Sequence, residues 1–456
     1  MEIRHPQLYK ITKNQRSKLS KSNEISKALL KKDMCPMKKN QCHLYFGLTN
    51  AEDRTKIMKG DAIMKRKIMA VLLAAAMTGS LAGCGSTQNK NAADASEEKM
   101  KVAMVTDSGD ITDQSFNQMT YEACKAWGKE NDIEFNYYKP QSDSDEARTA
   151  SVDQAVADGA NVIVLSGYVF APTVIDESDL YPEVKFLALD VSAGDICEKG
   201  IGEGYDYNPD HYNVTDYYNE DNVYCCTYQE ELSGFMAGYA AVMLGYRHLG
   251  FLGGMSVPAV NRYGYGYVQG ADAAAKELGI TDEVQVEYVC GGQFYGDADI
   301  TAYMDTWYGS KGVEVVFACG GGIYTSAAEA AVKTGGKVIG VDSDQSATID
   351  DYKEGLTVTS AMKGLQVTID NVLDAILDNE WDKYVGKIEN LGMESPDPAE
   401  NYVQLPEETT QWDGTFTKED YQKLVQRMYN GEYEVSSDST TFPETEITAT
   451  DYGSIK

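Results

Sequence analysis

From residue 101 onward this 456-residue chain alternates short apolar runs with amphipathic stretches, and no other feature limits its fold as strongly. Runs with the length and composition of buried strands lie at 101–106, 133–138, 162–166, 184–190, 223–227, 248–253, 284–290, 313–319, 337–341 and 356–360. Helical patterns lie between them at 116–129, 145–158, 230–243, 263–278, 298–308, 324–334 and 365–378. Such an alternation predicts parallel sheets that helices cover on both faces. Because so many strands exceed one small sheet, we predict an α/β fold with two lobes.

The first strand runs into Asp107, and a polar turn containing glycine leads to Phe116 and Asn117 at the start of a helix. In an open α/β sheet, ligands bind at the carboxyl ends of strands, where loops meet helix N-termini. This loop combines a carboxylate, a flat aromatic ring and a carboxamide. The combination suits a small molecule with an aromatic face and polar edges, and it indicates recognition rather than catalysis.

Other strand ends also carry polar groups or glycines. Asp190 and Asp342 each end a strand, Lys363 follows another, and Gly321 lies in a run of three glycines after a fourth. One aspartate at a strand end is often a cap or a turn former, but several together with an isolated lysine are harder to explain that way. Because uncompensated carboxylates repel each other, Lys363 or the hydroxyls of a ligand must offset them. The glycine run does not fit the dinucleotide motif G-x-G-x-x-G, so we expect close backbone approach to a ligand or tight strand–helix packing.

The sequence gives little support for an enzyme or a nucleic-acid-binding protein. Its four histidines form no recognisable Ser-His-Asp or Cys-His arrangement, and no H-E-x-x-H motif, paired metal spacing or P-loop occurs. We therefore expect no catalytic residue, cofactor or metal, although the strand-end carboxylates leave a glycosidase pair open. With 71 acidic and 40 basic residues, the chain does not offer the basic surface that nucleic acid requires.

Residues 64–83 have the order of a secretory signal: the charged segment Met64–Lys67, an apolar run too short to span a bilayer, and small residues before Cys84. The sequence Leu81-Ala-Gly-Cys84 resembles a bacterial lipobox, which implies cleavage before Cys84 and lipidation of its thiol. A buried core helix is the alternative interpretation. The polar residues 84–100 would then form a flexible tether between lipid and domain.

Three segments do not follow the alternation of strands and helices. Residues 1–63 are basic, with 14 Lys/Arg and 6 Asp/Glu, and they indicate either a start codon assigned too early or a genuine extension. Residues 192–222 are acidic, rich in tyrosine and without a helical or strand period. We predict a solvated surface insertion there rather than a Ca²⁺ site, because EF-hand spacing is absent. The tail 434–456 is expected to be poorly ordered.

A set of motifs in order along the chain points to one family. The motifs are Val105-Thr-Asp107, Asp113-Gln-Ser-Phe116-Asn117, Glu230-Glu231 with Gly234-Phe-Met-Ala-Gly238, Gly250-Phe-Leu-Gly-Gly254 with Arg262-Tyr263, and Ile339-Gly-Val-Asp342-Ser-Asp344-Gln345. Together they resemble the basic membrane protein (BMP) family, the lipoprotein substrate-binding components of ABC transporters typified by purine nucleoside receptors. The resemblance covers about residues 101–433.

The resemblance implies a type I periplasmic-binding-protein fold, in which two Rossmann-like lobes with parallel sheets close over a ligand cleft. Lobe 1 is expected at 101–229 and includes the insertion. Lobe 2 is expected at 230–345. Residues 346–433 are expected to return to lobe 1 as the C-terminal segment.

The resemblance also implies roles for the residues that would meet the base of a nucleoside. Phe116 and Tyr263 would stack on the purine from opposite lobes. Family members commonly carry phenylalanine at the second position, and Tyr263 keeps the flat face. Asn117 and Asp190 would read the edge of the base. The insertion that follows Asp190 departs from the family pattern.

The remaining site residues would meet the sugar. Asp342 would accept hydrogen bonds from the ribose hydroxyls, with Lys363 and Asp107 completing the sugar shell and Gly321 allowing backbone approach. A carboxylate facing the sugar would also disfavour a 5′-phosphate.

The resulting hypothesis is a monomeric receptor on the extracytoplasmic face of the cell membrane, anchored by lipid at Cys84. It would capture a purine nucleoside such as guanosine, inosine or adenosine and deliver it to ABC permease subunits without making or breaking a bond. A receptor for a sugar or another small metabolite is one alternative. An enzyme acting on nucleosides, for example a hydrolase, is the other.

Overall fold

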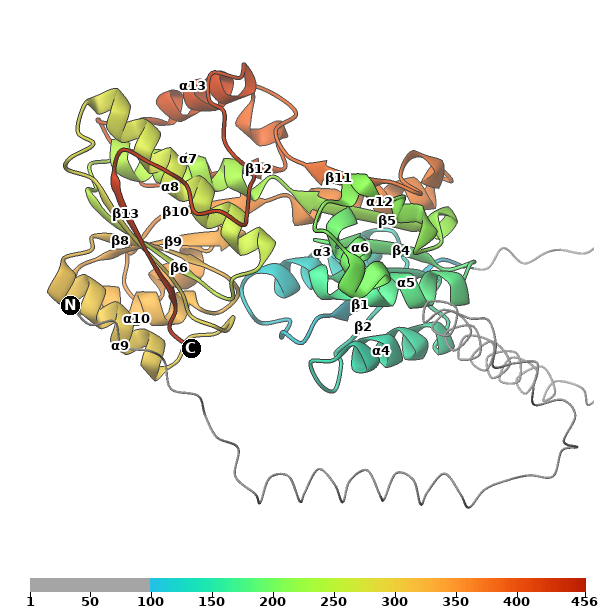
Figure 1. Cartoon of the computed structure of the whole chain (residues 1–456). Coiled ribbons are helices and arrows are strands. Elements are labelled where there is room, and N and C mark those ends of the chain that lie inside the picture. The colour runs from blue at the N-terminus through green and yellow to red at the C-terminus, as the bar shows by residue number, and fades with distance from the viewer. Residues whose placement is uncertain (1–98) are drawn as a thin grey trace, which may run out of the picture. The chain divides into compact units, whose positions relative to one another are not determined.

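The computed structural model describes residues 99–456, which form two β-sheets flanked by helices (Figure 1). The predictions for residues 1–63, for the signal at 64–83, and for Cys84 and the tether as far as residue 98 concern residues outside this described part. Among residues 99–456, no helix combines the length and the apolar character that a bilayer crossing requires.

Sheet A has six strands in the order β11-β5-β4-β3-β1-β2, and every pair is parallel. The strands are β1 (Lys101–Thr106), β2 (Glu134–Tyr138), β3 (Val162–Ser166), β4 (Lys185–Leu189), β5 (Val223–Tyr228) and β11 (Ile388–Leu391). Alternate residues of β1 enter different cores, because successive side chains of a strand point to opposite faces. Met104 packs in the core that contains α3 (Phe116–Glu130) and α12 (Leu365–Leu377). Val105 packs in the core that contains α4 (Asp145–Ala157) and α5 (Ala171–Leu180).

Sheet B has seven strands in the order β12-β10-β9-β8-β6-β7-β13, and only the β10–β12 pair is antiparallel. The strands are β6 (His248–Gly253), β7 (Gln285–Cys290), β8 (Val315–Cys319), β9 (Lys337–Asp342), β10 (Thr357–Lys363), β12 (Val403–Gln404) and β13 (Thr448–Ser454). One face of the sheet packs against α7 (Glu230–Met243) and α8 (Pro258–Leu278). The opposite face packs against α9 (Ala298–Thr306) and α10 (Tyr324–Thr334). Apart from β13, whose residues are mostly exposed, both faces are buried, as the apolar character of the strands predicts.

Helices α7 and α8 approach each other closely because glycines lie where their backbones meet. A Cβ atom on Gly234 would lie 2.1 Å from the carbonyl oxygen of Tyr263, and one on Gly266 would lie 2.1 Å from that of Glu231. No other residue fits at such positions without moving a helix. This packing fixes the start of α7 against the segment of α8 that carries Tyr263.

The predicted fold class is confirmed, and every strand expected from the sequence is present with ends within two residues except that of β10, which continues to Lys363. The expected return to the first lobe at residue 346 is wrong. Strand β10 pairs in parallel with β9 and therefore belongs to sheet B, so the chain reaches sheet A again only after Lys363. It leaves sheet A once more after β11, because β12 and β13 are strands of sheet B.

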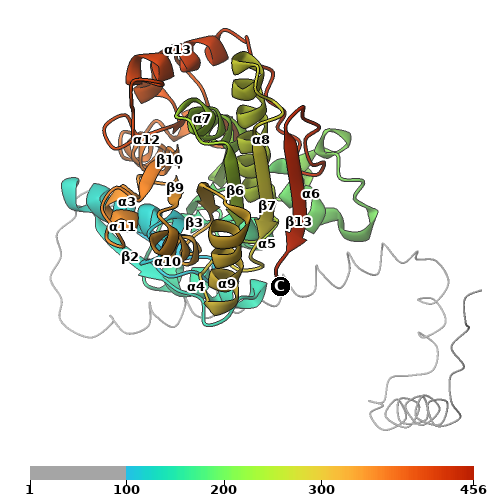
Figure 2. The ribbon, with the colours of Figure 1, turned by 90° about the vertical axis from the view of Figure 1, so that its left-hand side faces the viewer.

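Two segments expected to lack regular structure contain some. In the 192–222 insertion, α6 (Ala193–Ile201) begins with a capping box in which the Ser192 hydroxyl accepts from the Asp195 backbone N–H. Short 3₁₀ turns follow it. In the tail, β13 extends sheet B beside β7, as Figure 2 shows. Asp272 accepts from the backbone N–H groups of Glu446 and Ile447, and these bonds hold the tail that leads into β13.

Candidate ligand-binding site

The candidate site centres on Lys363, the last residue of β10, where the chain passes from sheet B to sheet A. Its side chain is only 2% exposed, and its ammonium lies 2.8 Å from Asp190 Oδ2, 3.3 Å from Glu230 Oε1 and 3.8 Å from Asp342 Oδ1. Asp190 follows β4 of the first lobe, whereas Glu230 and Asp342 lie in α7 and β9 of the second. One buried cation therefore joins carboxylates from both lobes.

The surrounding carboxylates raise the pKa of Lys363 more than burial lowers it. Burial alone would lower the pKa of Lys363, but the attraction of Asp190, Glu230 and Asp342 raises it above its ordinary value. Burial raises the pKa of Asp190 to about 6, although Lys363 opposes that shift. Lys363 is therefore charged at every physiological pH, while Asp190 titrates just below neutrality.

Glu230 and Arg262 extend the charged cluster toward Tyr263. The guanidinium Nε of Arg262 lies 2.6 Å from Glu230 Oε2, and the Glu230 side chain is completely buried. Burial would lower the pKa of Arg262, but the attraction of Glu230 raises it overall. Both residues lie within the sequence motifs, but the sequence predicts no role for either. Only the tertiary structure reveals that one carboxylate bridges the lysine and the residue preceding Tyr263.

Phe116 and Tyr263 approach the same ammonium from different lobes. Lys363 Nζ lies 4.7 Å from the centre of the Phe116 ring and 5.8 Å from that of Tyr263. The two ring centres are therefore at most 10.5 Å apart, which is the sum of those distances.

Tyr263 is held in one orientation. Its hydroxyl donates to Asp342 Oδ1 at 3.3 Å, and its ring meets Phe317 edge-on at 5.9 Å between centres. Burial raises the pKa of Tyr263 far above its ordinary value, so the hydroxyl stays protonated and remains a donor. A phenylalanine here would keep the ring but lose the bond to Asp342.

The turn before α3 contacts the second lobe directly. Ser115 Oγ donates to Asp342 Oδ2 at 2.5 Å. Gln345 Nε2 donates to the Gln114 carbonyl at 2.8 Å, and Thr348 Oγ1 donates to Gln114 Oε1 at 3.0 Å. These bonds, which we call the lobe latch, join residues more than 200 positions apart and hold the two lobes together beside Lys363.

Asn117 is buried and belongs to a hydrogen-bonded cluster in the first lobe. Its amide Nδ2 donates to Asp107 Oδ1 at 3.1 Å and to Asp113 Oδ2 at 3.2 Å. Because both partners are acceptors, the amide orientation is determined. Asn117 Oδ1 is buried and has no hydrogen-bond partner, and the same holds for Asp190 Oδ1. Unpaired buried acceptors are rare and each needs an explanation.

The backbone is strained at two of the predicted residues. Asp190 has a φ of +59° and Asp342 has a φ of +63°, in a backbone region that residues other than glycine seldom adopt. Residues in such conformations cluster at functional sites. Gly321 also has a positive φ of +51°, and a Cβ on it would lie 2.7 Å from the Phe294 carbonyl. The glycine thus permits close contact with the loop that carries Phe294.

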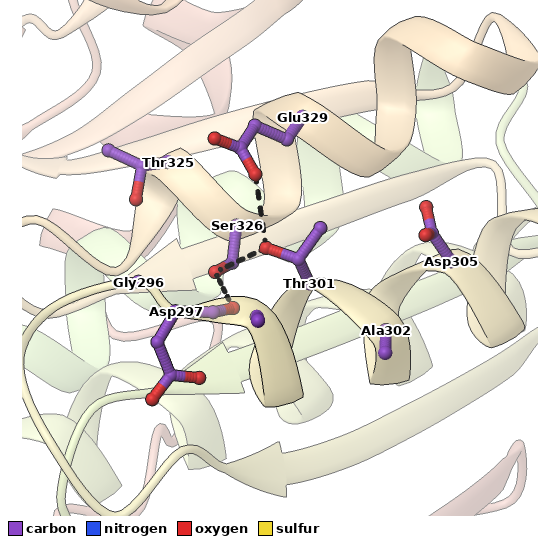
Figure 3. A pocket seen from close by; sticks show the side chains of 9 residues that line it. Gly296, Asp297, Thr301, Ala302, Asp305, Thr325, Ser326 and Glu329 are labelled. Atoms are coloured by element: carbon purple, nitrogen blue, oxygen red, sulfur yellow. Dashed lines mark hydrogen bonds between the residues drawn. The ribbon is translucent and has the colours of Figure 1, made fainter.

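Two of the cavities among residues 99–456 differ in size and place. The larger, about 760 Å³, reaches Asp342 and Lys363 and continues past the lobe latch to α3 and α12. The smaller, about 390 Å³, lies between α9 and α10 in the second lobe (Figure 3). Its polar side chains bond to one another: Thr301 Oγ1 contacts both Ser326 Oγ and Glu329 Oε2. Within residues 99–456, no cluster of three His, Cys, Asp or Glu could hold a metal ion.

Sequence comparisons identify relatives over most of the described chain. A family model for the PnrA-like ABC transporter substrate-binding protein matches residues 100–438. The nucleoside-binding protein BmpA of Lactococcus lactis is 26% identical over 337 residues, covering 70% of this chain and 87% of that protein. Basic membrane protein B of Borreliella burgdorferi is 27% identical over 263 residues, covering 57% of this chain and 69% of that protein. An uncharacterised lipoprotein of Pyrococcus furiosus is 25% identical over 71% of this chain and 74% of its own length.

Structure comparisons support the fold. A solute-binding protein of an ABC transporter system from Conexibacter woesei has a TM-score of 0.54 at 21% identity, covering 74% of this chain and 99% of that one. A solute-binding protein from Aeropyrum pernix has a TM-score of 0.53 at 20% identity, covering 75% and 88%. Both the type I periplasmic-binding-protein fold and the expected family are confirmed. The chain belongs to the Bmp family of ABC transporter substrate-binding proteins.

Proposed function

We propose that this substrate-binding protein captures a purine nucleoside and delivers it to the permease of its transporter. The observation that carries the proposal is the pair of buried, unpartnered acceptors, Asn117 Oδ1 and Asp190 Oδ1. A purine edge with N–H donors would satisfy both atoms. The nucleoside-binding relative in Lactococcus lactis supports the same class of ligand.

The aromatic residues account for the base. Phe116 and Tyr263 stack on opposite faces of the purine, and each stacking contact contributes about 1–3 kcal/mol. Because stacking tolerates either purine, Asn117 and Asp190 decide between them. Two acceptors favour guanine, which presents a ring N–H beside an amino group, over adenine, which presents only an amino group.

The sugar lies against the charged part of the site. Asp342 accepts from the ribose hydroxyls, while Lys363 and Asp107 complete the polar shell and Gly321 allows the backbone to come near. A hydroxyl donor suits this cluster, because three carboxylates, Asp190, Glu230 and Asp342, surround Lys363. The mechanism is closure of the lobes around the ligand, which the lobe latch stabilises.

Isothermal titration of the purified protein with guanosine, inosine and adenosine tests this function, with uridine, ribose and galactose as controls. We expect saturable heat for the purine nucleosides, with guanosine ahead of inosine and adenosine, because only guanine presents a ring N–H beside an amino group. A response to galactose alone would identify a sugar receptor instead. Release of free base from inosine would identify an enzyme.

We further propose that the protein is tethered to the outer face of the cell membrane by lipid on Cys84. The order of charged, apolar and small residues at 64–83 supports this, and relatives in Pyrococcus are named lipoproteins. Metabolic labelling with palmitate should mark the wild type and not Cys84→Ala. Label that persists in Cys84→Ala would contradict the anchor.

A further inference from the structure

The carboxamide of Asn117 could meet a ligand in either of two ways, because its oxygen accepts hydrogen bonds and its nitrogen donates them. The nitrogen has two N–H groups and two acceptors: Nδ2 lies 3.1 Å from Asp107 Oδ1 and 3.2 Å from Asp113 Oδ2. The oxygen Oδ1 is buried and has no hydrogen-bond partner among the residues that the structure describes. Oδ1 is therefore the atom of this side chain that remains for a ligand.

Asp113 lies in the turn before α3 and accepts four hydrogen bonds. Its Oδ1 accepts from the backbone N–H groups of Ser115 and Gln118, at 2.9 and 3.0 Å. Its Oδ2 accepts from the backbone N–H of Asn117 at 3.1 Å and from the amide of the same residue. A carboxylate has about four acceptor positions, so this one is fully used. An amide in its place would turn an N–H group toward another donor, and the turn therefore requires a carboxylate here.

Asp107 and Gly109 restrict the same amide nitrogen. Asp107 Oδ1 also accepts from the backbone N–H groups of Ser108 and Gly109, so the carboxylate is fixed within its own turn. A Cβ atom on Gly109 would lie only 2.4 Å from Asn117 Nδ2 and 2.9 Å from Asp107 Oδ1. Any larger residue at this position would therefore displace the amide. The nitrogen of Asn117 is held by two acceptors and packs closely against the bare backbone of a glycine.

We propose that Asp113 and Gly109 are positioning residues that make the site select nucleobases with N–H donors. This inference rests on the proposed function and deepens it, because both residues act through Asn117. With its nitrogen held in place, Asn117 presents an acceptor to the base. A base with N–H groups pairs with that acceptor, whereas a base with only ring nitrogens sets one acceptor against another and leaves both unpaired.

The test compares guanosine with purine riboside by isothermal titration. Both ligands have the purine ring system and the same ribose, but the base of purine riboside has no N–H group. For the wild type we expect guanosine to bind at least roughly tenfold more tightly, because purine riboside leaves a buried acceptor unpaired. Stacking and ribose contacts are shared by the two ligands, so the ratio of their affinities reports on the edge of the base.

Two variants disturb the amide in different ways. Asp113→Asn removes one of the two acceptors that hold the nitrogen of Asn117. Guanosine affinity should fall by roughly tenfold, whereas purine riboside affinity should stay within about twofold, so most of the preference is lost. Gly109→Ala displaces the same amide without changing the charge, and it should reduce the preference in the same direction. A purely structural role would instead weaken the binding of both nucleosides equally.

Each variant has a matched control far along the chain. Asp420 accepts from the backbone N–H of Thr417 and closes the first turn of α13 (Lys418–Tyr429), so Asp420→Asn repeats the chemical change at another helix start. A Cβ atom on Gly414 would meet no other atom within 4 Å, so Gly414→Ala repeats the second change in open space. Both controls should keep the wild-type preference. Urea unfolding of all four variants separates lost specificity from lost stability.

The outcomes separate the inference from the proposed function. Equal losses for both nucleosides in Asp113→Asn and Gly109→Ala, or an unchanged preference in both variants, would overturn the inference and leave the nucleoside receptor standing. A wild type that binds guanosine and purine riboside equally would do the same. If Asp113→Asn does not fold, Gly109→Ala decides. If the wild type binds neither nucleoside, the proposed function fails and this inference fails with it.

Discussion

Replacing Lys363 by methionine should destabilise the protein strongly, and more at neutral than at acidic pH. Methionine has a similar length and no charge, so the change removes the ammonium and leaves Asp190, Glu230 and Asp342 facing one another. The wild-type ammonium lies 2.8, 3.3 and 3.8 Å from these carboxylates. Of the three, Glu230 alone keeps a cation, Arg262.

The size of the effect follows from burial. Removing one partner of a buried ion pair costs about 3–5 kcal/mol, because it leaves a buried charge uncompensated. The pH dependence follows from Asp190, whose pKa burial raises to about 6 in the folded protein from its ordinary value of 3.8. A carboxyl with a raised pKa contributes stability below its unfolded pKa, and this contribution is lost as pH rises through the folded pKa. The shift of about two units corresponds to roughly 3 kcal/mol between about pH 4 and pH 6.

The wild type should therefore lose stability from this group between about pH 4 and pH 6, and Lys363→Met should lose more. Without the lysine, the folded pKa of Asp190 rises further, so the window of loss extends toward neutral pH. The gap between wild type and variant should be widest near pH 8 and narrow near pH 5, as the carboxyls protonate.

Urea unfolding, followed by circular dichroism at about pH 5, 7 and 8, measures these differences. Lys333→Met is the matched control, because that lysine is half exposed and pairs with Asp305 on the surface. Its effect should stay below about 1 kcal/mol at every pH. A Lys363→Met protein within about 0.5 kcal/mol of this control near pH 8 would refute the reasoning.

Three further predictions concern the rings, the latch and the tail. Phe116→Ala and Tyr263→Ala should each weaken guanosine binding by roughly 5- to 150-fold in calorimetry. Tyr263→Phe should weaken binding much less, because the ring face remains. Equal losses of affinity for the two Tyr263 variants would contradict stacking and place the effect in the hydroxyl. Ser115→Ala removes the hydrogen bond to Asp342. It should weaken ligand binding by roughly tenfold and increase the radius of gyration of the ligand-free protein in small-angle scattering. An unchanged affinity would contradict a role of this bond in closure. Ending the chain at Thr440 removes β13 and the buried Ile447. The shortened protein should have a lower melting temperature and should associate through the uncovered edge of β7. A shortened protein as stable and as monomeric as the full chain would contradict this prediction.

Much of the fold follows from local sequence pattern. Strand and helix positions follow from which residues are apolar and at what period, and this information lies within a dozen residues of each element. The strand-end residues Asp107, Asp190 and Asp342 can be identified for the same reason, since each directly follows an apolar run or ends one. The order of the motifs along the chain is also a property of the sequence, and it is enough to predict the family.

The misassigned segments are those whose partners are distant. Strand β10 has the sequence of an ordinary strand, and only its pairing with β9 assigns it to sheet B. Strand β13 has a polar, largely exposed sequence, and it is a strand because the β7 edge supplies its hydrogen bonds. Helix α6 is an exception, because its local signals are present in the sequence: Ile196 and Cys197 form its buried face, and Ser192 and Asp195 cap its first turn.

For the site, the sequence by itself determined which chemical groups were present at the ends of strands, and the tertiary structure decided how they combine. Glu230 pairs with Lys363, 133 residues away in the chain, and with Arg262, 32 residues away. Ser115 donates to Asp342, which lies 227 residues away. Hydrophobic period encodes which face of an element is buried, but it carries no information about which charge will meet which. That pairing depends on how the two lobes come together, and only the folded chain determines it.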